Sequence, residues 1–310
     1  MYLVTGGAGF IGASLAEALV ARGERVRIFD DFSTGLRENL AAIADRVEVI
    51  VGDLRDLAAV RRAMAGVQYV SHQAALRSVP RSVDDPLSSD AVNTHGTLHV
   101  LMAAREAKVR RVVYASSSSV YGDSEVLPKA EDQPTMPISP YAVSKLAGEQ
   151  YCRVFTRLYG LETVGLRYFN VFGPKQSPES KYAAVVPLFI RAALRDEPLE
   201  VHGDGEQSRD FTYIDNVVQA NLLSFTAPKA AGEAFNIACN ERHSVIEIAR
   251  TVERLLGHQL KINHTPTRAG DVRHTLASIE KAQRLLGYQP TVGFEAGMHQ
   301  TIAALRASLA

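Results

Sequence analysis

The chain of 310 residues is poor in cysteine, lacks tryptophan and carries no net charge. Its two cysteines, Cys152 and Cys239, form no CxxC motif, so neither a disulfide framework nor a zinc or other metal site is expected. Basic and acidic residues number 34 each, which argues against a nucleic-acid or anionic-membrane surface. No apolar run approaches the roughly 20 residues of a membrane span. With a strand pattern already at Tyr2–Thr5 and no leader expected, we predict a cytoplasmic protein.

Short β-branched runs alternate with helix-length segments in the first half of the chain. Strands are expected at residues 1–5, 25–29, 47–51, 67–70, 112–115 and 163–167, and helices at 11–22, 57–65, 88–107 and 140–159. Nearly continuous apolar strands separated by helices predict a parallel sheet covered on both faces. The expected fold is therefore α/β, a Rossmann-type doubly wound sheet.

The alternation loosens after about residue 170, where prolines and glycines become frequent. Helices are expected at 184–195, 215–225, 245–256 and 294–308, with short strands between them. A chain of 310 residues is also longer than one core usually needs. We therefore predict a nucleotide-binding domain over residues 1–170 and a smaller α/β substrate lobe over 171–310, with their segments interleaved.

The first expected strand runs into the sequence TGGAGFIG, where Gly6, Gly9 and Gly12 form a GxxGxxG turn that opens a helix. Such glycines let backbone N–H groups approach a pyrophosphate at a helix N-terminus. A plain glycine turn is the alternative, but the position between a strand and an amphipathic helix indicates a dinucleotide site. Phe10 and Ile11, inside the turn, are expected to line that site.

Acidic and small residues follow the next strands. Asp30 and Asp31 lie about 20 residues past the glycines, where a carboxylate accepts hydrogen bonds from the adenosine ribose and repels a 2′-phosphate. They predict NAD rather than NADP, although Asp30 could instead cap the following turn. Asp53, followed by Leu54, is interpreted as an adenine contact or as a helix cap. The segment Gln73-Ala74-Ala75 would let the chain pass close to the cofactor phosphates.

Tyr141 and Lys145 are four residues apart on one expected helix and therefore share a face. A free phenol has a pKa of about 10, and both an ammonium group and a positive nicotinamide ring favour its ionised form. Tyr141 would then take a proton from a sugar hydroxyl while hydride leaves for the dinucleotide. The spacing alone also fits an unrelated surface pair. Ser117, after the fifth strand, would relay the proton, or it belongs to a serine-rich turn.

The segments TGGAGFIG, VGD, HQAA, SSSSVYG, YAVSK, RYFNVFGP and SRDFTYIDN occur in one order along nearly the whole chain. Together they resemble the extended short-chain dehydrogenase/reductase family, and within it the nucleotide-sugar epimerases and dehydratases. The resemblance implies NAD as the cofactor, a UDP-sugar as the substrate, Tyr141 as the base, Lys145 on the nicotinamide ribose and Ser117 at the substrate hydroxyl. It also implies that Asn93 and Tyr168 lie beside the cofactor. Substrate contacts are implied for Asn170, Arg209, Arg268, Asp271 and Thr275.

The residues after the catalytic hydroxyl bear on the reaction. Dehydratases of the family carry an acidic pair where this chain has Ser118 and Ser119, so dehydration is disfavoured. The resemblance then implies a UDP-hexose 4-epimerase that acts through a transient 4-keto sugar. A tyrosine at the position of Thr275 narrows the sugar pocket in this family, so the small Thr275 predicts that UDP-N-acetylglucosamine is accepted along with UDP-glucose. Alternatively, Thr275 only packs its loop.

Two other functions remain open on the same scaffold. A UDP-glucuronate 4-epimerase or decarboxylase would keep Tyr141 and Lys145 and would have to recognise a C6 carboxylate. A non-enzymatic dinucleotide sensor is disfavoured because it would have no use for these residues together with Ser117.

A homodimer is predicted because the segments 88–107 and 140–159 match helices that pair in the family as a four-helix bundle. Apolar residues on the first segment are the expected contact face: Ala91, Leu98, Leu101 and Met102. The alternative is that they face the protein's own sheet.

Overall fold

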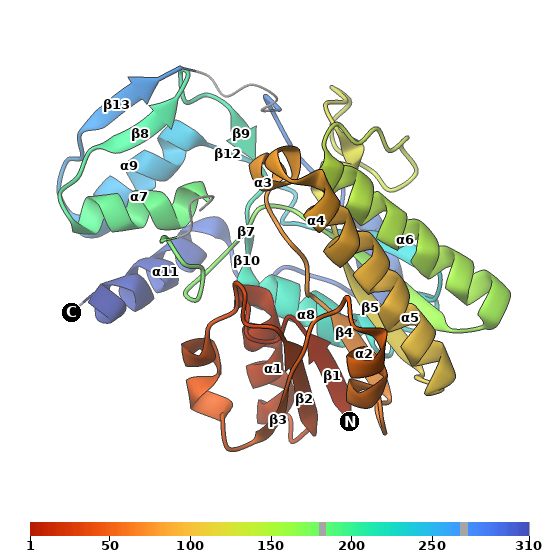
Figure 1. Cartoon of the computed structure of the whole chain (residues 1–310). Helices are drawn as coiled ribbons and strands as arrows, with labels where there is room; N and C mark the ends of the chain where they lie inside the picture. The colour runs from red at the N-terminus through yellow and green to blue at the C-terminus, as the bar shows by residue number, and fades with distance from the viewer. Residues whose placement is uncertain (180–183, 267–271, 310) are drawn as a thin grey trace.

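In the computed structural model, which describes residues 1–179, 184–266 and 272–309, a seven-stranded parallel sheet forms the centre of the molecule (Figure 1). Its strand order is β11-β6-β5-β4-β1-β2-β3. The strands are β1 Tyr2–Thr5, β2 Val26–Asp30, β3 Val47–Val51, β4 Tyr69–His72, β5 Arg111–Ser117, β6 Glu162–Tyr168 and β11 Glu233–Ile237. The order reverses between β1 and β4, and open parallel sheets bind ligands outside the carboxyl ends of the strands at such a point. The predicted α/β Rossmann-type fold is confirmed.

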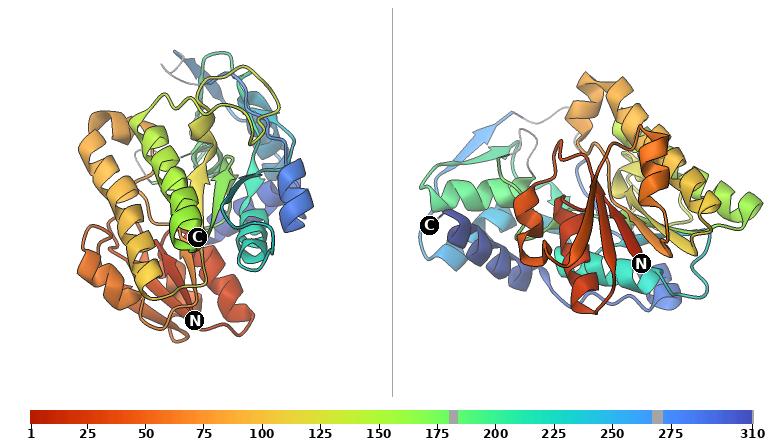
Figure 2. Two further views of the ribbon diagram at one scale, coloured as in Figure 1. Left: turned by 90° about the vertical axis from the view of Figure 1, so that its right-hand side faces the viewer. Right: turned by 60° about the horizontal axis from the view of Figure 1, so that its bottom comes forward.

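Helices cover both faces of the sheet (Figure 2). One face carries α1 Phe10–Ala21 and α8 Ile214–Ser224, and the other carries α2 Leu57–Ala63, α5 Gly96–Glu106 and α6 Pro140–Tyr159. Successive strand residues point to opposite faces. Accordingly, Leu3 packs into the core beneath α2 and α5, whereas Val4 packs into the core beneath α1, and both are fully buried.

The ends of α6 are fixed by local chemistry. Ser139 is the N-cap, and its hydroxyl accepts a hydrogen bond from the backbone N–H of Ala142 at 3.2 Å. Pro140 is preorganised for the first helical position, and Gly160 ends the helix in the left-handed region at φ 69°. These signals place Tyr141 in the first turn of the helix, at the carboxyl edge of the sheet.

A smaller lobe lies beyond the carboxyl edge of the sheet (Figure 1). It contains α7 Val185–Leu194, α9 Val245–Leu256 and α11 Phe294–Leu309, with the strand pairs β8 Leu199–His202 and β13 Ile262–Thr265, β9 Ser208–Arg209 and β12 His243–Ser244, and β7 Val171–Phe172 and β10 Thr212–Tyr213. The remaining elements are η1 Arg37–Ile43, α3 Val79–Asp84, α4 Pro86–Asp90, η2 Ala91–His95, η3 Ser118–Tyr121 and α10 Glu280–Leu286. Phe172, Phe211 and Phe294 pack edge-on or tilted, with ring centroids 5.6–6.3 Å apart, and join the lobe to the connecting strands.

The expected elements agree with the structure within a few residues, with two exceptions. The segment expected as one helix over 88–107 is broken by the π-helical turn Ala91–His95, and such turns occur often at functional sites. The strand β11 and the helix α8 both come from beyond residue 170, yet β11 pairs with β6 and α8 packs beside α1. The division at residue 170 stays a prediction.

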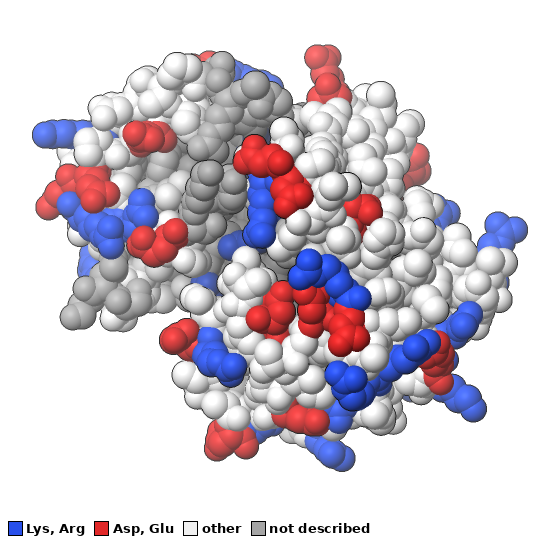
Figure 3. Space-filling view, in the orientation of Figure 1, with Lys and Arg blue, Asp and Glu red and all other residues white. Residues whose placement is uncertain are grey.

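Acidic and basic side chains are interspersed over the face of the molecule drawn in Figure 3. In the part of the chain that the structure describes, no helix is both long enough and apolar enough to cross a lipid bilayer.

Candidate active site

The turn from β1 into α1 is built so that only glycine fits. Gly6 has φ 65°, and a Cβ there would lie 2.6 Å from the backbone of Ala74. A Cβ on Gly12 would lie 2.2 Å from the carbonyl oxygen of Gly6. Gly9 is the N-cap of α1 and makes no side-chain cap, so the first backbone N–H groups of the helix remain available to an anion. The plain glycine turn is therefore the weaker interpretation.

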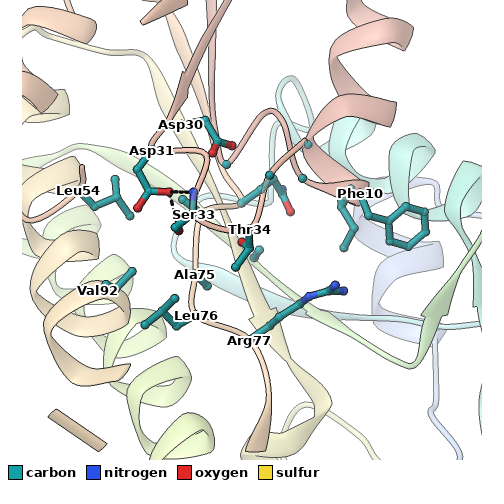
Figure 4. Close-up of a pocket in the computed structure, with 18 of the residues that line it drawn as sticks. Phe10, Asp30, Asp31, Ser33, Thr34, Leu54, Ala75, Leu76, Arg77 and Val92 are labelled. Carbon is teal, nitrogen blue, oxygen red and sulfur yellow. Dashed lines mark hydrogen bonds between the residues drawn. The ribbon is translucent and has the colours of Figure 1, made fainter. Parts of the chain in front are cut away.

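A cavity of about 320 Å³ follows the carboxyl ends of the strands (Figure 4). Its lining includes most of the residues predicted from the sequence: Gly6, Gly9, Phe10, Ile11, Gly12, Asp30, Asp31, Asp53, Leu54, Gln73, Ala74, Ala75, Ser117, Tyr141, Lys145, Tyr168 and Asn170. The fold thus brings together side chains from distant strand ends in one crevice.

Asp30 closes the end of the crevice next to β2. Its carboxylate accepts hydrogen bonds from the backbone N–H of Ala8 at 2.9 Å and of Phe32 at 2.8 Å, and burial raises its pKa. Asp30 therefore caps the following turn and also faces the cavity, and its two oxygens retain acceptor capacity for ribose hydroxyls. The neighbouring loop residues Ser33 and Thr34 also line the cavity, which the sequence motifs did not predict.

Asp53 lies at the same end of the cavity. Its carboxylate pairs with Arg55, whose Nη2 is 2.5 Å from Oδ2, and this hydrogen bonding lowers the pKa of Asp53. The alternative that Asp53 caps the next helix is wrong. Asp56 caps α2 instead, because its carboxylate accepts from the backbone N–H groups of Ala58 and Ala59.

Tyr141, Lys145 and Ser117 meet at the other end of the cavity. The Lys145 ammonium donates to the carbonyl oxygen of Ala115 at 2.9 Å and lies 6.0 Å from the ring centroid of Tyr141. The Ser117 hydroxyl accepts a hydrogen bond from the hydroxyl of Ser119 at 2.9 Å, and it lowers the pKa of the Tyr141 phenol. The alternative of an unrelated surface pair is wrong, since Lys145 is buried and both side chains line the cavity.

The electrostatics of this pair differ from the sequence-based expectation. Burial raises the pKa of Tyr141, and the Ser117 hydroxyl and the Arg77 guanidinium offset this only in part. Burial also lowers the pKa of Lys145 to about 8. Lys145 alone therefore does not ionise Tyr141 at neutral pH, and a further positive charge is needed beside the phenol.

Tyr168 and Gln73 line the cavity between the Asp30 end and the Tyr141 end. The Tyr168 hydroxyl accepts hydrogen bonds from Asn221 at 2.8 Å and from Gln73 at 3.1 Å. Asn221 is buried on α8, and its side-chain carbonyl accepts a second hydrogen bond from Gln73 at 3.1 Å. This residue, far along the chain, fixes two cavity side chains, and no motif indicated it.

Asn93 was expected beside the cofactor, but it does not line the described cavity. Its side chain lies one layer behind, where it accepts from the backbone N–H of Leu76 at 2.8 Å and donates to the carbonyl of Leu76 at 3.1 Å. It also donates to the hydroxyl of Ser144 at 3.1 Å. Asn93 therefore clamps the cavity-lining backbone onto the catalytic helix, and its place beside the cofactor stays a prediction.

Arg77 is a cavity residue that the motifs missed. Its side chain extends over the cavity from the segment after β4, with the guanidinium toward the side of Phe10 (Figure 4). Burial lowers its pKa, and within the described residues no carboxylate forms an ion pair with it. A guanidinium in this state suits an anionic ligand group. The available signal was a basic residue two positions after the HQAA segment.

Only some of the residues predicted to contact the substrate line this cavity. Asn170 lines it and donates to the carbonyl oxygen of Asp210 at 3.0 Å. Arg209 and Thr275 lie together along β9 without lining the described cavity: Thr275 N–H donates to the carbonyl of Ser208 at 3.0 Å, and so does the Arg209 guanidinium at 2.9 Å. Arg268 and Asp271 lie outside the described residues.

A glycine cradle at one end of a crevice and a tyrosine–lysine pair at the other are typical of the extended short-chain dehydrogenase/reductases. Residues 2–238 match the family described as "NAD dependent epimerase/dehydratase family". The chain belongs to that family. The predicted family and the predicted cofactor, NAD, are thereby confirmed.

Three relatives are similar to the chain over almost its whole length. The "UDP-glucose 4-epimerase" of Mycolicibacterium smegmatis is 38% identical, with 98% of each sequence covered. The crystal structure of the UDP-glucose 4-epimerase of Thermus thermophilus, a complex with NAD, has a TM-score of 0.91 at 37% identity, with 99% of each chain covered. The UDP-N-acetylglucosamine 4-epimerase of Methanobrevibacter ruminantium M1, in complex with UDP-N-acetylmuramic acid, has a TM-score of 0.95 at 36% identity, covering 99% of this chain and 98% of that one.

Proposed function

We propose that the protein is a UDP-hexose 4-epimerase that interconverts UDP-glucose with UDP-galactose and UDP-N-acetylglucosamine with UDP-N-acetylgalactosamine. The observation that carries the proposal is the placement of Tyr141, Lys145 and Ser117 together at the end of the dinucleotide cavity, with the Lys145 ammonium 6.0 Å from the ring centroid of Tyr141. Ser118 and Ser119 follow in place of the carboxylates that dehydration requires. The relatives named above, which act on UDP-glucose and UDP-N-acetylglucosamine, support both substrates.

The residues of the cavity fit NAD. The glycine cradle admits a pyrophosphate, the carboxylate of Asp30 suits a ribose with free hydroxyls, and the Arg77 guanidinium suits a phosphate. Bound NAD supplies the acceptor for the hydride of the sugar C4 carbon, the donor that returns it, and the positive charge that Tyr141 needs. Lys145 would hold the nicotinamide ribose.

Tyr141 then performs the proton chemistry on the sugar. The phenolate takes the proton of the C4 hydroxyl, which Ser117 orients, and a 4-keto sugar is left. After the sugar has turned about its diphosphate, the opposite face of C4 receives the hydride back, and Tyr141 returns the proton to the C4 oxygen. Atoms and electrons balance within one cycle, so no external oxidant or reductant is consumed.

The activity is tested by incubating the purified holoenzyme separately with UDP-glucose, UDP-N-acetylglucosamine and UDP-glucuronate and separating the products by chromatography. We expect the C4 epimers of the first two substrates and no net formation of NADH. Release of CO₂ from UDP-glucuronate would instead identify a decarboxylase. Conversion of UDP-glucuronate alone to its C4 epimer would identify the glucuronate-specific enzyme.

Replacing Asp30 by asparagine should weaken the preference for NAD over NADP. Like charges a few ångströms apart repel by about 1–4 kcal/mol at intermediate dielectric constants, so the preference should fall about tenfold or more. Competition binding of the two cofactors measures the change, and Asp45→Asn is the matched control, because Asp45 is exposed and does not line the described cavity. The wild-type protein, once denatured, should release NAD. Release of NADP alone would show that the assigned role of Asp30 is wrong.

We also propose a homodimer, with a contact face that differs from the one expected. Leu101 is fully buried, and Leu98 and Met102 pack against the same core, so these residues face the protein's own interior. Large apolar side chains are instead exposed on α3, α4 and α6: Val79, Val83, Leu87, Val143, Val154 and Leu158. These helices form an outer layer that fits pairing with a second copy (Figure 1).

Leu87→Glu should convert the dimer to a monomer, because it introduces a charge where an apolar side chain is 82% exposed on the proposed face. Light scattering at micromolar concentration measures the mass. Val126→Glu is the matched control, since Val126 is 61% exposed but lies on the loop after η3. A wild-type protein of monomer mass would refute the pairing.

A further inference from the structure

The catalytic helix carries a third buried residue on the face of Tyr141 and Lys145. Glu149 lies four residues after Lys145, so the three side chains follow one another along α6. Only 1% of Glu149 is exposed, and it does not line the described dinucleotide cavity. Its position therefore requires an explanation other than ligand contact at that site.

Glu149 forms a two-point pair with Arg167 on β6. The Arg167 Nη2 donates to Oε1 at 2.6 Å, and Nε donates to Oε2 at 3.0 Å. The Ser116 hydroxyl, at the edge of the cavity, donates to the same Oε2 at 2.9 Å. Ser116 lies between Ser117 and Ala115, whose carbonyl oxygen accepts the hydrogen bond from the Lys145 ammonium. The Glu149–Arg167 pair therefore anchors the end of β5 that faces the reacting groups.

The remaining Arg167 nitrogen leads away from the cavity. Its Nη1 donates to the Tyr121 hydroxyl at 2.8 Å, and that hydroxyl donates to the side-chain oxygen of Asn236 at 2.7 Å. The Asn236 amide nitrogen donates to the backbone carbonyls of Lys129 at 2.9 Å and Ser278 at 3.2 Å. Tyr121 and Asn236 are buried, so this middle part of the path is shielded from water.

This path ends on the segment that carries Thr275. The backbone N–H of Lys129 donates to the carbonyl of Leu276 at 2.7 Å, and that of Ser278 donates to the carbonyl of Lys129 at 2.8 Å. Residues 276–278 are therefore held to Lys129 by backbone hydrogen bonds. Asn236, which is bonded to the carbonyls of Lys129 and Ser278, is linked to Arg167 through the Tyr121 hydroxyl. One continuous network of hydrogen bonds connects the edge of the catalytic site to the segment that directly follows Thr275.

The charge balance of the network favours a positioning role. Glu149 and Arg167, the two charged members of the network, pair with each other. Lys145 donates to the backbone carbonyl of Ala115 instead of to Glu149. Buried ion pairs are weak sources of stability, but they impose one geometry, because a displaced member would leave an unpaired charge. The network is also not needed to carry protons out of the site, since epimerisation returns to the sugar every proton that it takes.

We propose that Ser116, Glu149, Arg167, Tyr121 and Asn236, named here the Arg167 brace, are positioning residues that hold the catalytic end of β5 and residues 276–278 in fixed relation. The assignment of residues 276–278 to the substrate side rests on the proposed function. The brace has two arms: Glu149 supports the groups that carry out proton transfer, and Tyr121 with Asn236 supports the segment beside the sugar.

The two arms should have different kinetic signatures. Tyr121→Phe removes the hydroxyl that links Arg167 to Asn236 and should raise KM for the UDP-sugar about 2- to 10-fold, the range that its neutral hydrogen bond to Asn236 supplies, while kcat stays within about twofold. Glu149→Gln should lower kcat by more than it raises KM, because it releases the end of β5 beneath Ser117. Should the glutamine variant fail to fold, Tyr121→Phe alone carries the test.

Tyr213→Phe is the matched control. Its hydroxyl donates to the Gln300 side chain at 2.7 Å, the same length as the bond that Tyr121 makes, but it lies in the lobe next to α11. All proteins are studied as NAD-loaded holoenzymes, with the NAD content measured. The control should keep the wild-type KM even when its thermal stability falls as much as that of Tyr121→Phe.

Hydrogen exchange gives a readout that does not need activity. The backbone amides of Lys129 and Ser278 should exchange faster in Tyr121→Phe than in the wild type and should be unchanged in Tyr213→Phe. Equal exchange in both variants, or an equal KM in both, would overturn the brace. If the wild-type protein epimerises no UDP-sugar, the proposed function fails, while the exchange measurement still decides whether the brace holds residues 276–278.

Discussion

Replacing Tyr141 by phenylalanine should leave the fold and the bound NAD intact and lower kcat about 10²–10⁴-fold. The substitution removes only the phenolic oxygen, the proposed acceptor of the sugar proton, from a residue that lines the cavity together with Ser117 and Lys145. The measurement is kcat for UDP-glucose, together with the NAD released on denaturation. Tyr151→Phe is the matched control, because Tyr151 lies on the same helix and is exposed. A variant with near wild-type kcat would remove Tyr141 from the mechanism.

The pH profile provides a second check on this assignment. Burial raises the pKa of Tyr141, so the phenolate is the scarce form at neutral pH. The wild-type rate should therefore rise as the pH is raised through neutrality, because the fraction of ionised Tyr141 grows. That rise should be absent from the residual rate of Tyr141→Phe. A rise of equal size in the variant would assign the titration to another group.

The second large effect is expected from Thr275→Tyr, which should depress turnover of UDP-N-acetylglucosamine and largely spare UDP-glucose. The Thr275 hydroxyl is buried and finds no hydrogen-bond partner among the described residues, and its backbone lies against Ser208, next to Arg209. A tyrosine ring would fill space near the sugar C2 substituent. Overfilling a packed site costs about 1–3 kcal/mol, or roughly 5- to 150-fold in rate when it acts in the transition state.

The comparison is kcat/KM on the two substrates for wild type, Thr275→Tyr and Thr275→Val. The valine variant keeps the volume of the side chain, and the threonine hydroxyl makes no described hydrogen bond that it would break, so it should retain the wild-type ratio. An equal loss on both substrates in Thr275→Tyr would favour the alternative that this residue only packs its loop. Absence of wild-type activity on the acetylated sugar would refute the hypothesis that the small Thr275 side chain admits it.

The cofactor end of the site could be predicted from the sequence because its signals are local. Gly6 adopts a left-handed φ of 65° in its turn, a Cβ on Gly12 would clash with Gly6 only six residues away, and Asp30 directly ends a strand. The spacing of Tyr141 and Lys145 is likewise a property of one helix. Short-range geometry of this kind can be predicted from the spacing of residues along the chain.

The remaining features depend on contacts between distant segments. Asn221 acts on Tyr168 and Gln73 only because α8 packs under the sheet, and its sequence context is an ordinary helix. The hydrogen bonds of Asn93 to the backbone of Leu76 could not be predicted, because the π-helical turn that carries Asn93 has no sequence signature. Arg77 was missed for a similar reason, since its position over the cavity follows from that clamp.

The sheet order also constrains how the chain is made. During synthesis β6 is complete long before residues 233–237 leave the ribosome, and until then its outer edge presents unpaired N–H and C=O groups on a strand whose residues are mostly buried in the finished fold. Such an edge is prone to pairing with other chains, so the emerging polypeptide depends on its last third, or on a chaperone, to cover it. The pairing is distant in sequence and therefore slow to form. A fragment ending near residue 170 should aggregate instead of folding as a free nucleotide-binding unit.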